Sequence, residues 1–259
     1  MAAAPAFTPV TLPPVTVAAA PNPTPLVIPT ERASDDGPAW PFKVGEQLNY
    51  QVFLGDDAPM ASANFQIRAR SRYFDHDGLL LAVKAQTTGV AQRLFIASDQ
   101  INSYVDPKAL LPFRTEMNLV EGKRRLNQTL TVNQDYGTAT TPNGLRIEIP
   151  VGTHDYLSFF YAVRTFNLTP PKRNAVSILV NNKPKTLFIS SLKRETIQLG
   201  SQKIPAIALS LTTDDSQSDK YLLRMWVSDD KRRLPLRITG STEIGPFRAD
   251  LVILPATSQ

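Results

Sequence analysis

The sequence predicts an all-β, mainly antiparallel domain, built as one curved, many-stranded, barrel-like sheet with a single short buried helix near residues 155–166. Three observations predict this fold class. From Trp40 onward, short apolar runs alternate with turn residues, and several runs have the period of two that half-buried strands show. The runs recur at roughly 8–12-residue spacing, which is typical of sandwiches and barrels. Only one segment, near residues 155–166, breaks the pattern.

The first 39 residues differ from the rest of the chain. Nine of the 22 prolines lie there, and no charged residue precedes Glu31. Proline removes backbone donors and favours extended, polyproline-like conformers, so this stretch cannot build a core. We predict a Pro/Ala-rich disordered arm over residues 1–39 and a single domain over residues 40–259. The arm is interpreted either as a passive tether or as a docking segment for a partner.

The strand candidates follow in chain order. The first hairpin joins a strand before Leu54 to one over 61–70, and Asp75-His76-Asp77-Gly78 predicts a tight turn in which glycine takes a positive φ. The remaining candidates are 79–87, 90–98, 100–105, 113–120, 124–132, 136–140, 145–149, 176–180, 185–192, 195–199, 203–212, 220–228, 235–241 and 247–254.

The one helical candidate runs from Asp155 to Phe166. Its apolar residues lie on nearly every side, and Thr153 or Asp155 is placed to cap its start. A helix that is apolar all round is normally buried. The helix is therefore predicted to pack against the inner face of the sheet.

Composition excludes several kinds of chemistry. The chain has no cysteine among 259 residues, which excludes thiolate zinc sites, iron–sulfur clusters and cysteine nucleophiles. No run of 18 apolar residues is present, so no transmembrane helix is expected. Prolines interrupt any apolar stretch at the N-terminus, so an intact signal peptide is not expected in this chain.

Candidate catalytic and metal sites are weak. His154-Asp155 with Ser158 has the residue types of a hydrolase triad, but neighbours in sequence rarely converge as a triad does, and a helix cap is the favoured interpretation. Asp75-His76-Asp77 is favoured as a turn over a metal site. We predict no catalytic residues, no metal and no cofactor. An uncharacterised hydrolase is kept as a minor alternative to a protein without enzymatic activity.

The chain is mildly basic, with a net charge of +5. Basic runs such as Lys123-Arg124-Arg125 and Lys231-Arg232-Arg233 lie at expected turns and lack interleaved aromatic residues. No nucleic-acid-binding module is recognisable, so we do not expect a nucleic-acid partner. The charge permits contact with anionic lipid or polysaccharide without requiring either.

Four motifs together resemble a bacterial family known as domain of unknown function 3108. They are Pro41–Tyr50 with its Gly45-Glu46, the turn Asp106–Pro112, the helix Asp155–Arg164, and Trp226–Asp230 followed by Arg233-Leu234-Pro235. Ala109 departs from the threonine that the family tends to have. The resemblance implies a curved antiparallel barrel in exported bacterial proteins and carries over no catalytic residue.

The resulting hypothesis is a non-enzymatic periplasmic or cell-envelope β-barrel protein that binds an apolar or amphipathic, lipid-like ligand. The candidate ligand-binding residues are Phe160, Tyr161, Arg164 and Trp226. The alternative is a structural or accessory subunit of an envelope assembly, docking through residues 1–39 and its sheet edges. An apolar cavity beside Phe160, Tyr161 and Trp226 would favour the first hypothesis, and a solid core there the second.

Overall fold

The computed structural model describes residues 38–55, 58–89, 91–94, 96–214, 221–242 and 245–252. All but the last two residues of the predicted arm, 1–39, lie outside these ranges. Its two interpretations, tether and docking segment, therefore stay predictions.

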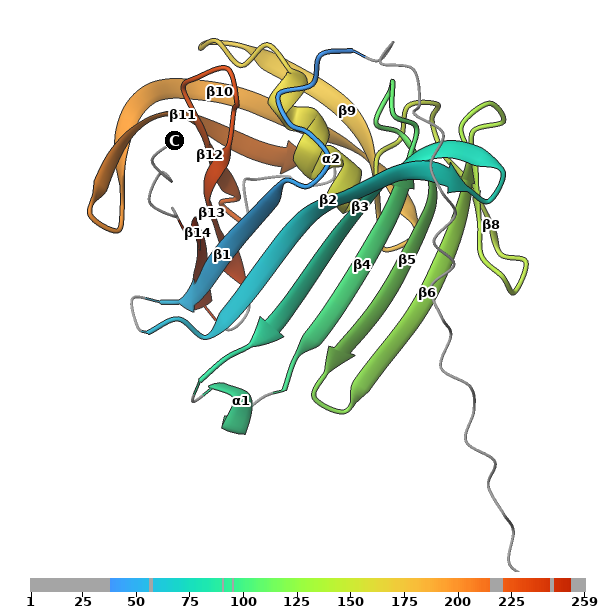
Figure 1. The fold of residues 1–259 in the computed structure, drawn as a ribbon, viewed down its shortest axis with the longest axis horizontal. Coiled ribbons are helices and arrows are strands. Elements are labelled where there is room, and N and C mark those ends of the chain that lie inside the picture. Colours follow the sequence, from blue (N-terminus) through green and yellow to red (C-terminus); the bar gives the residue numbers. More distant parts are fainter. Residues whose placement is uncertain are drawn as a thin grey trace, which may run out of the picture. The chain divides into compact units, whose positions relative to one another are not determined.

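The described residues form one antiparallel sheet of 14 strands (Figure 1). The strands are β1 Gln47–Leu54, β2 Ala61–Tyr73, β3 His76–Thr87, β4 Ser98–Val105, β5 Pro112–Glu121, β6 Arg124–Asn133, β7 Thr138–Thr140, β8 Arg146–Glu148, β9 Arg173–Val180, β10 Lys183–Leu199, β11 Gln202–Thr213, β12 Arg224–Ser228, β13 Pro235–Thr242 and β14 Gly245–Leu251. The predicted fold class is confirmed.

The strand order shows how the sheet is built. It runs β8-β7-β6-β5-β4-β3-β2-β1-β14-β13-β12-β11-β10-β9, so nearly every strand pairs with its neighbour in sequence. The exception is β1, which pairs with β14 along Tyr50–Leu54 and joins two successive meanders. The sheet is not closed, because β8 and β9 stand at its two ends and do not pair with each other.

Helix α2, Tyr156–Ala162, continues into the 3₁₀ turn η1, Val163–Thr165, and confirms the predicted helix. Asp155 is its N-cap, and the side chains of Asp155 and Ser158 form a reciprocal capping box. All its residues except Tyr156 are buried. Figure 1 shows the sheet curving around the helix, which contacts β3, β4 and β9. No helix among the described residues is long and apolar enough to cross a membrane.

The main core lies where α2 meets the curved sheet. Phe160 stacks on Phe65 of β2 with 4.1 Å between ring centroids, and Tyr50 of β1 meets both rings edge-on. The Tyr50 hydroxyl donates to the carbonyl of Pro235, 2.5 Å away, and so ties β1 to β13. These contacts hold the helix against both meanders.

Three local predictions were wrong. The predicted strand 90–98 contains a short helix instead, α1 Ala91–Leu94, and β4 begins only at Ser98. The turn after β2 places its positive φ angles at Phe74 and Asp75, not at a glycine. Gly78 lies inside β3, where an added Cβ would come within 2.8 Å of the Phe113 ring, so close packing and not turn geometry favours glycine there.

The predicted strands 185–192 and 195–199 are one long strand, β10. A bulge between Ser191 and Lys193 shifts its register with β11. The polar pair Lys193-Arg194 resembled a turn in the sequence, but it lies just beyond this bulge. A bulge bends a strand and increases its twist without ending it, as is seen where β10 curves in Figure 1.

Candidate ligand-binding site

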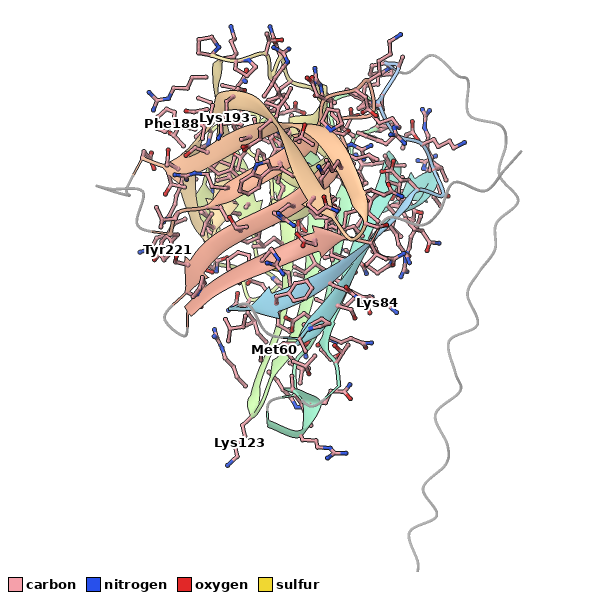
Figure 2. All side chains as sticks on the ribbon, turned by 90° about the vertical axis from the view of Figure 1, so that its left-hand side faces the viewer. Met60, Lys84, Lys123, Phe188, Lys193 and Tyr221 are labelled. Atoms are coloured by element: carbon pink, nitrogen blue, oxygen red, sulfur yellow. The ribbon has the colours of Figure 1, made fainter. Side chains whose placement is uncertain are left out.

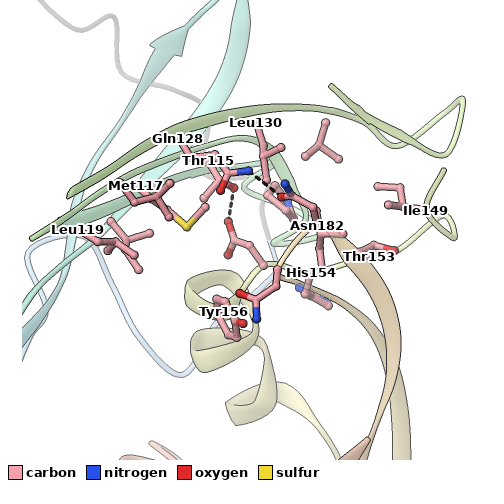
Figure 3. A pocket seen from close by; sticks show the side chains of 17 residues that line it. Thr115, Met117, Leu119, Gln128, Leu130, Ile149, Thr153, His154, Tyr156 and Asn182 are labelled. Carbon is pink, nitrogen blue, oxygen red and sulfur yellow. Dashed lines mark hydrogen bonds between the residues drawn. The ribbon is translucent and has the colours of Figure 1, made fainter. Parts of the chain in front are cut away.

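An apolar cavity of about 130 Å³ lies between the inner face of β4–β6 and the N-terminal end of α2 (Figure 3). A single buried water needs roughly 10–15 Å³, so this space is large enough for part of an organic ligand. Most of its walls are apolar. The apolar lining consists of Ile101, Pro112, Met117, Leu119, Leu126, Leu130, Val132, Ile149 and Leu179.

The alternation of β5 and β6 produces this wall. Met117 and Leu119 point inward from β5, and Leu126, Leu130 and Val132 point inward from β6. Because successive side chains of a strand point to opposite faces, the residues between them face outward. The segment leading into α2 covers this inner face only in part, which leaves the cavity.

Asp155 forms the polar part of the wall. Its Oδ2 accepts hydrogen bonds from Ser103 Oγ at 2.6 Å and Thr115 Oγ1 at 2.5 Å, and its Oδ1 accepts one from the Ser158 N–H at 2.7 Å. Three donors satisfy a carboxylate that is almost completely buried. The carboxylate thus ties the start of α2 to β4 and β5 and sets the distance across the cavity.

His154 and Ser158 complete the cap and do not form a triad with Asp155. Ser158 Oγ lies 3.1 Å from His154 Nδ1 and accepts the Asp155 N–H at 3.0 Å, and its side chain is fully buried. In a catalytic triad the carboxylate accepts a hydrogen bond from the imidazole. The Asp155 carboxylate instead accepts from the Ser158 N–H and from the hydroxyls of Ser103 in β4 and Thr115 in β5. Burial lowers the pKa of His154 below its usual range. The predicted capping role is confirmed.

The backbone of His154 also covers part of the edge of β9. Its N–H donates to the Ser177 carbonyl and its carbonyl accepts the Leu179 N–H, both at 2.9 Å. This parallel bridge to Ile178 positions the β9–β10 turn beside the cavity. The end of the sheet at β9 is thereby held near the inner face of β6.

An amide rim lies at the β6 side of the cavity. Asn181 and Asn182 form the β9–β10 turn with φ angles of 49° and 62°, which asparagine tolerates better than most residues. Asn182 Oδ1 accepts a hydrogen bond from Gln128 Nε2 of β6 at 2.7 Å (Figure 3). We call this bond the latch, since it joins β6 to the β9–β10 turn at the rim of the cavity.

The four residues predicted from sequence do not line the cavity. Phe160 and Tyr161 lie farther along α2 in the solid core, with 4% and 0% of their surfaces exposed. Tyr161 packs edge-on against Phe42 and Phe160. Burial raises the pKa of its hydroxyl well above the usual range. The core beside these two rings is filled, an outcome that by itself favours the assembly-subunit hypothesis. An apolar cavity lies instead at the other end of the same helix.

Arg164 has a structural role away from the cavity. Its side chain is fully buried and forms a two-pronged ion pair with Glu46. It also donates to the carbonyls of Arg232, at 3.0 and 3.1 Å, and of Pro41, at 3.0 Å. Its guanidinium carbon lies 5.1 Å from the centre of the Phe42 ring. Arg164 therefore ties η1 to the segment before β1 and to the β12–β13 turn.

Trp226 lies in β12 between the buried residues Met225 and Val227, so its side chain points to the opposite face of the strand. It is partly buried, and its Nε1 donates to Glu195 Oε1 at 2.8 Å. This bond lowers the pKa of Glu195. Trp226 is thus held on the sheet by β10.

The remaining sequence candidates are structural as well. His76 packs its ring against Phe113, and Asp77 pairs with Arg70 at 2.7 Å. Within the described ranges, no group of three or more His, Cys, Asp or Glu side chains is arranged to hold a metal ion.

Sequence reasoning missed the residues that do line the cavity. The alternation Leu126, Gln128, Leu130 in the predicted strand 124–132 marked an inward face. Nothing local in the sequence indicated that a short helix would leave this part of the face uncovered. Gln128, a polar residue among inward leucines, was the one available signal.

The comparisons with known proteins agree with this fold. The model of a family described as "Protein of unknown function (DUF3108)" matches residues 47–252. A β-barrel-like protein of DUF1849 from Brucella abortus is similar in structure, with a TM-score of 0.55, 8% sequence identity, and coverage of 81% of this chain and 96% of that one.

A DUF1089 family protein from Pseudomonas aeruginosa has a TM-score of 0.44 and 6% identity, with 70% of this chain and 89% of that one covered. No curated protein matches the chain in sequence. At 8% identity, the similarity to the Brucella abortus protein shows the fold alone.

Proposed function

The chain belongs to the DUF3108 family, and we propose that it is a non-enzymatic binding protein of the periplasm or cell envelope that takes up the apolar chain of a lipid-like ligand. The observation that carries the proposal is the cavity between β4–β6 and α2, with its apolar walls and amide rim. Binding sites for small molecules are typically concave and mostly apolar, with a few placed polar groups.

The polar groups of the site support binding over catalysis. Asp155 and Ser158 are both engaged in capping α2, and each is buried. The rim carries the amides of Gln128, Asn181 and Asn182, and the side chains of Thr153, His154 and Tyr156 also line the cavity. The His154 Nδ1 is engaged with Ser158 Oγ at 3.1 Å. Amides donate and accept hydrogen bonds but serve neither as nucleophiles nor as general bases at neutral pH.

Filling the cavity tests this function. Met117 lines the cavity, whereas Met60 lies in the segment between β1 and β2 (Figure 2) and is not among the residues that line the cavity. We expect Met117→Trp to weaken binding of the neutral fluorescent probe N-phenylnaphthylamine by about tenfold or more, which is about 1.4 kcal/mol. Met60→Trp makes the same chemical change elsewhere and is expected to leave the affinity unchanged. Equal affinities in all three proteins would contradict the proposal.

The location rests on the exported character that the family resemblance implies. Fractionation of the native host tests it. Recovery of the protein with periplasmic or membrane markers supports the proposal, and recovery with cytoplasmic markers contradicts it.

The second candidate function is a subunit of an envelope assembly. The edge of β6 favours it, because no described strand pairs with residues 125–130 on the side away from β5. A strand with unpaired backbone groups is a template for another chain. Native mass spectrometry of protein purified from its host separates the candidates: a bound lipid-sized mass supports the carrier, and a stable protein partner supports the subunit.

A further inference from the structure

The cavity continues around the edge of β6 into a groove on the outer face of the sheet. This groove has a volume of about 650 Å³ and is bordered by β4–β6 and by the β7–β8 turn at Thr141–Leu145. It shares four lining residues with the cavity: Met117, Leu126, Gln128 and Asn182. The apolar cavity and the outer groove are therefore two parts of one site that meet at the latch.

The outer groove is lined by amides. Gln100 and Asn102 come from β4, Asn118 from β5 and Asn127 from β6, while Asn143 comes from the β7–β8 turn. They belong to a wider pattern, since one row of directly paired residues crosses six strands. The row consists of Asn49, Asn64, Lys84, Gln100, Asn118 and Asn127.

The groove carries little free charge. The charged residue that borders it is Glu116, whose carboxylate accepts from Arg114 Nε at 2.8 Å and from the Tyr104 hydroxyl at 3.3 Å. Lys84 of the row is not among the residues that line the groove. The surface thus offers donors and acceptors in equal measure without a net electrostatic preference.

One acceptor in the groove lacks a partner. Among the described residues, the Oδ1 of Asn102 is buried and makes no hydrogen bond. A buried polar atom without a partner costs free energy. The atom is covered in this structure, so a ligand hydroxyl would remove that cost only if the Asn102 amide turned toward the groove.

The edge of β6 adds backbone groups to the same place. Thr131 and Asn133 direct their N–H and C=O groups toward β7. Because alternate residues of an antiparallel strand point the same way, Asn127 and Thr129 direct theirs to the edge where no described strand pairs. A head group that passes from the cavity to the groove meets these donors and acceptors.

We infer that the ligand is an amphiphile with a neutral, polyhydroxylated head group, as in a glycolipid, whose apolar chain occupies the cavity and whose head lies in the amide groove. The inference rests on the proposed function, since the chain must enter the cavity first. Hydroxyl groups both donate and accept, as amides do, and an uncharged head suits a groove without free cations or anions.

Displacement of N-phenylnaphthylamine by two detergents whose alkyl chains differ by one carbon tests the inference, because one methylene contributes only about 0.8 kcal/mol. Dodecyl maltoside has a neutral disaccharide head, and laurate has a carboxylate. Both are used below the concentrations at which they form micelles. We expect dodecyl maltoside to bind about tenfold or more tightly than laurate. Equal affinities, or tighter binding of laurate, would overturn the inference and leave the proposed function intact.

Two variants test whether the head group binds in the groove. Asn118→Ala is expected to remove the advantage of dodecyl maltoside while leaving laurate unchanged. Asn49→Ala, in the same row but outside the groove, is expected to alter neither. An advantage that survives Asn118→Ala overturns the placement. If N-phenylnaphthylamine does not bind at all, the proposed function fails, and the inference fails with it.

Discussion

At the scale of single residues, Asp155 has two structural roles. It caps α2 through the Ser158 N–H and anchors the helix to Ser103 and Thr115. A helix cap alone is worth about 0.5–2 kcal/mol. The two bonds from the Ser103 and Thr115 hydroxyls fix the start of the helix against β4 and β5.

Replacing this carboxylate by an amide is the first stability test. Asp155→Asn places an NH₂ group where an acceptor is needed, and we expect it to lower the free energy of unfolding by about 1–3 kcal/mol. Asp135→Asn, at an exposed position, is the matched control and should change stability by less than about 0.5 kcal/mol. Urea denaturation measures both. Equal stability of the two variants would show that the buried carboxylate is dispensable.

His154 predicts a pH dependence. Burial lowers its pKa from the usual 6.5, so the unfolded chain takes up a proton at a higher pH than the folded protein. The stability is therefore full above pH 6.5 and declines as the pH falls from there toward the folded-state pKa. The pKa values of Glu195 and Asp230 are also lowered, but these two groups change the stability only when the pH falls below their usual pKa values of 4.5 and 3.8.

The measurement is urea denaturation at a series of pH values between neutral and mildly acidic. His154→Gln should flatten the decline, whereas His76→Gln, at an exposed position, should leave it in place. An unchanged pH profile in His154→Gln would assign the decline to another group.

At this scale the sequence predicted the capping but not the site. The order Asp155-x-x-Ser158 before an apolar run is a local signal, so the cap could be found without a structure. Phe160, Tyr161 and Arg164 stood out because aromatic and charged residues often bind ligands. Their burial depends on β1, β2 and the β12–β13 turn, which are distant in sequence.

At the scale of elements, the buried ion pair of Arg164 and Glu46 joins η1 to the entry of β1. Removing one member of a buried pair leaves the other charge without compensation, which typically costs about 3–5 kcal/mol. We expect Arg164→Met to destabilise by that amount. The double variant with Glu46→Gln should recover part of the loss, because the stranded carboxylate is gone.

The control for this prediction is Arg146→Met in β8, whose partner Glu148 is largely exposed. An exposed pair contributes about 0–1 kcal/mol, so little change is expected. Thermal denaturation of the three variants and the unmodified protein compares them. A double variant that is no better than Arg164→Met alone would mean that packing of the arginine stem, and not charge, dominates.

Element boundaries were predictable where turns were short and polar, and not where the backbone bulges. The bulge between Ser191 and Lys193 let β10 continue through a charged stretch that resembled a turn. The short helix Ala91–Leu94 replaced a predicted strand. Neither event follows from local periodicity, because each depends on how neighbouring strands curve.

At the scale of the whole molecule, we predict that the latch between β6 and the β9–β10 turn controls access to the cavity. Gln128→Ala removes the bond that spans the gap between β6 and the β9–β10 turn. We expect faster association and faster release of N-phenylnaphthylamine, with a stability loss of about 1 kcal/mol or less. Stopped-flow fluorescence measures both rates.

The control is Gln198→Ala, which removes a hydrogen bond to Gly200 at the β10–β11 turn, away from the cavity. It should leave both rates unchanged. Rates unaffected by Gln128→Ala would show that the ligand enters by another route.

The pairing of β1 with β14 has a consequence for how the protein is made. Tyr50 of β1 pairs with Leu251 of β14. The second edge of β1, an early strand in the chain, therefore stays unpaired until β14, the last strand, is available. Contacts so distant in sequence are slow to form because loop closure costs entropy before the contact is gained. Each meander can assemble from adjacent hairpins as it emerges, but their joining is the expected late step. Until then β1 is an open edge on a nascent chain, and an unpaired strand edge is a template for aggregation.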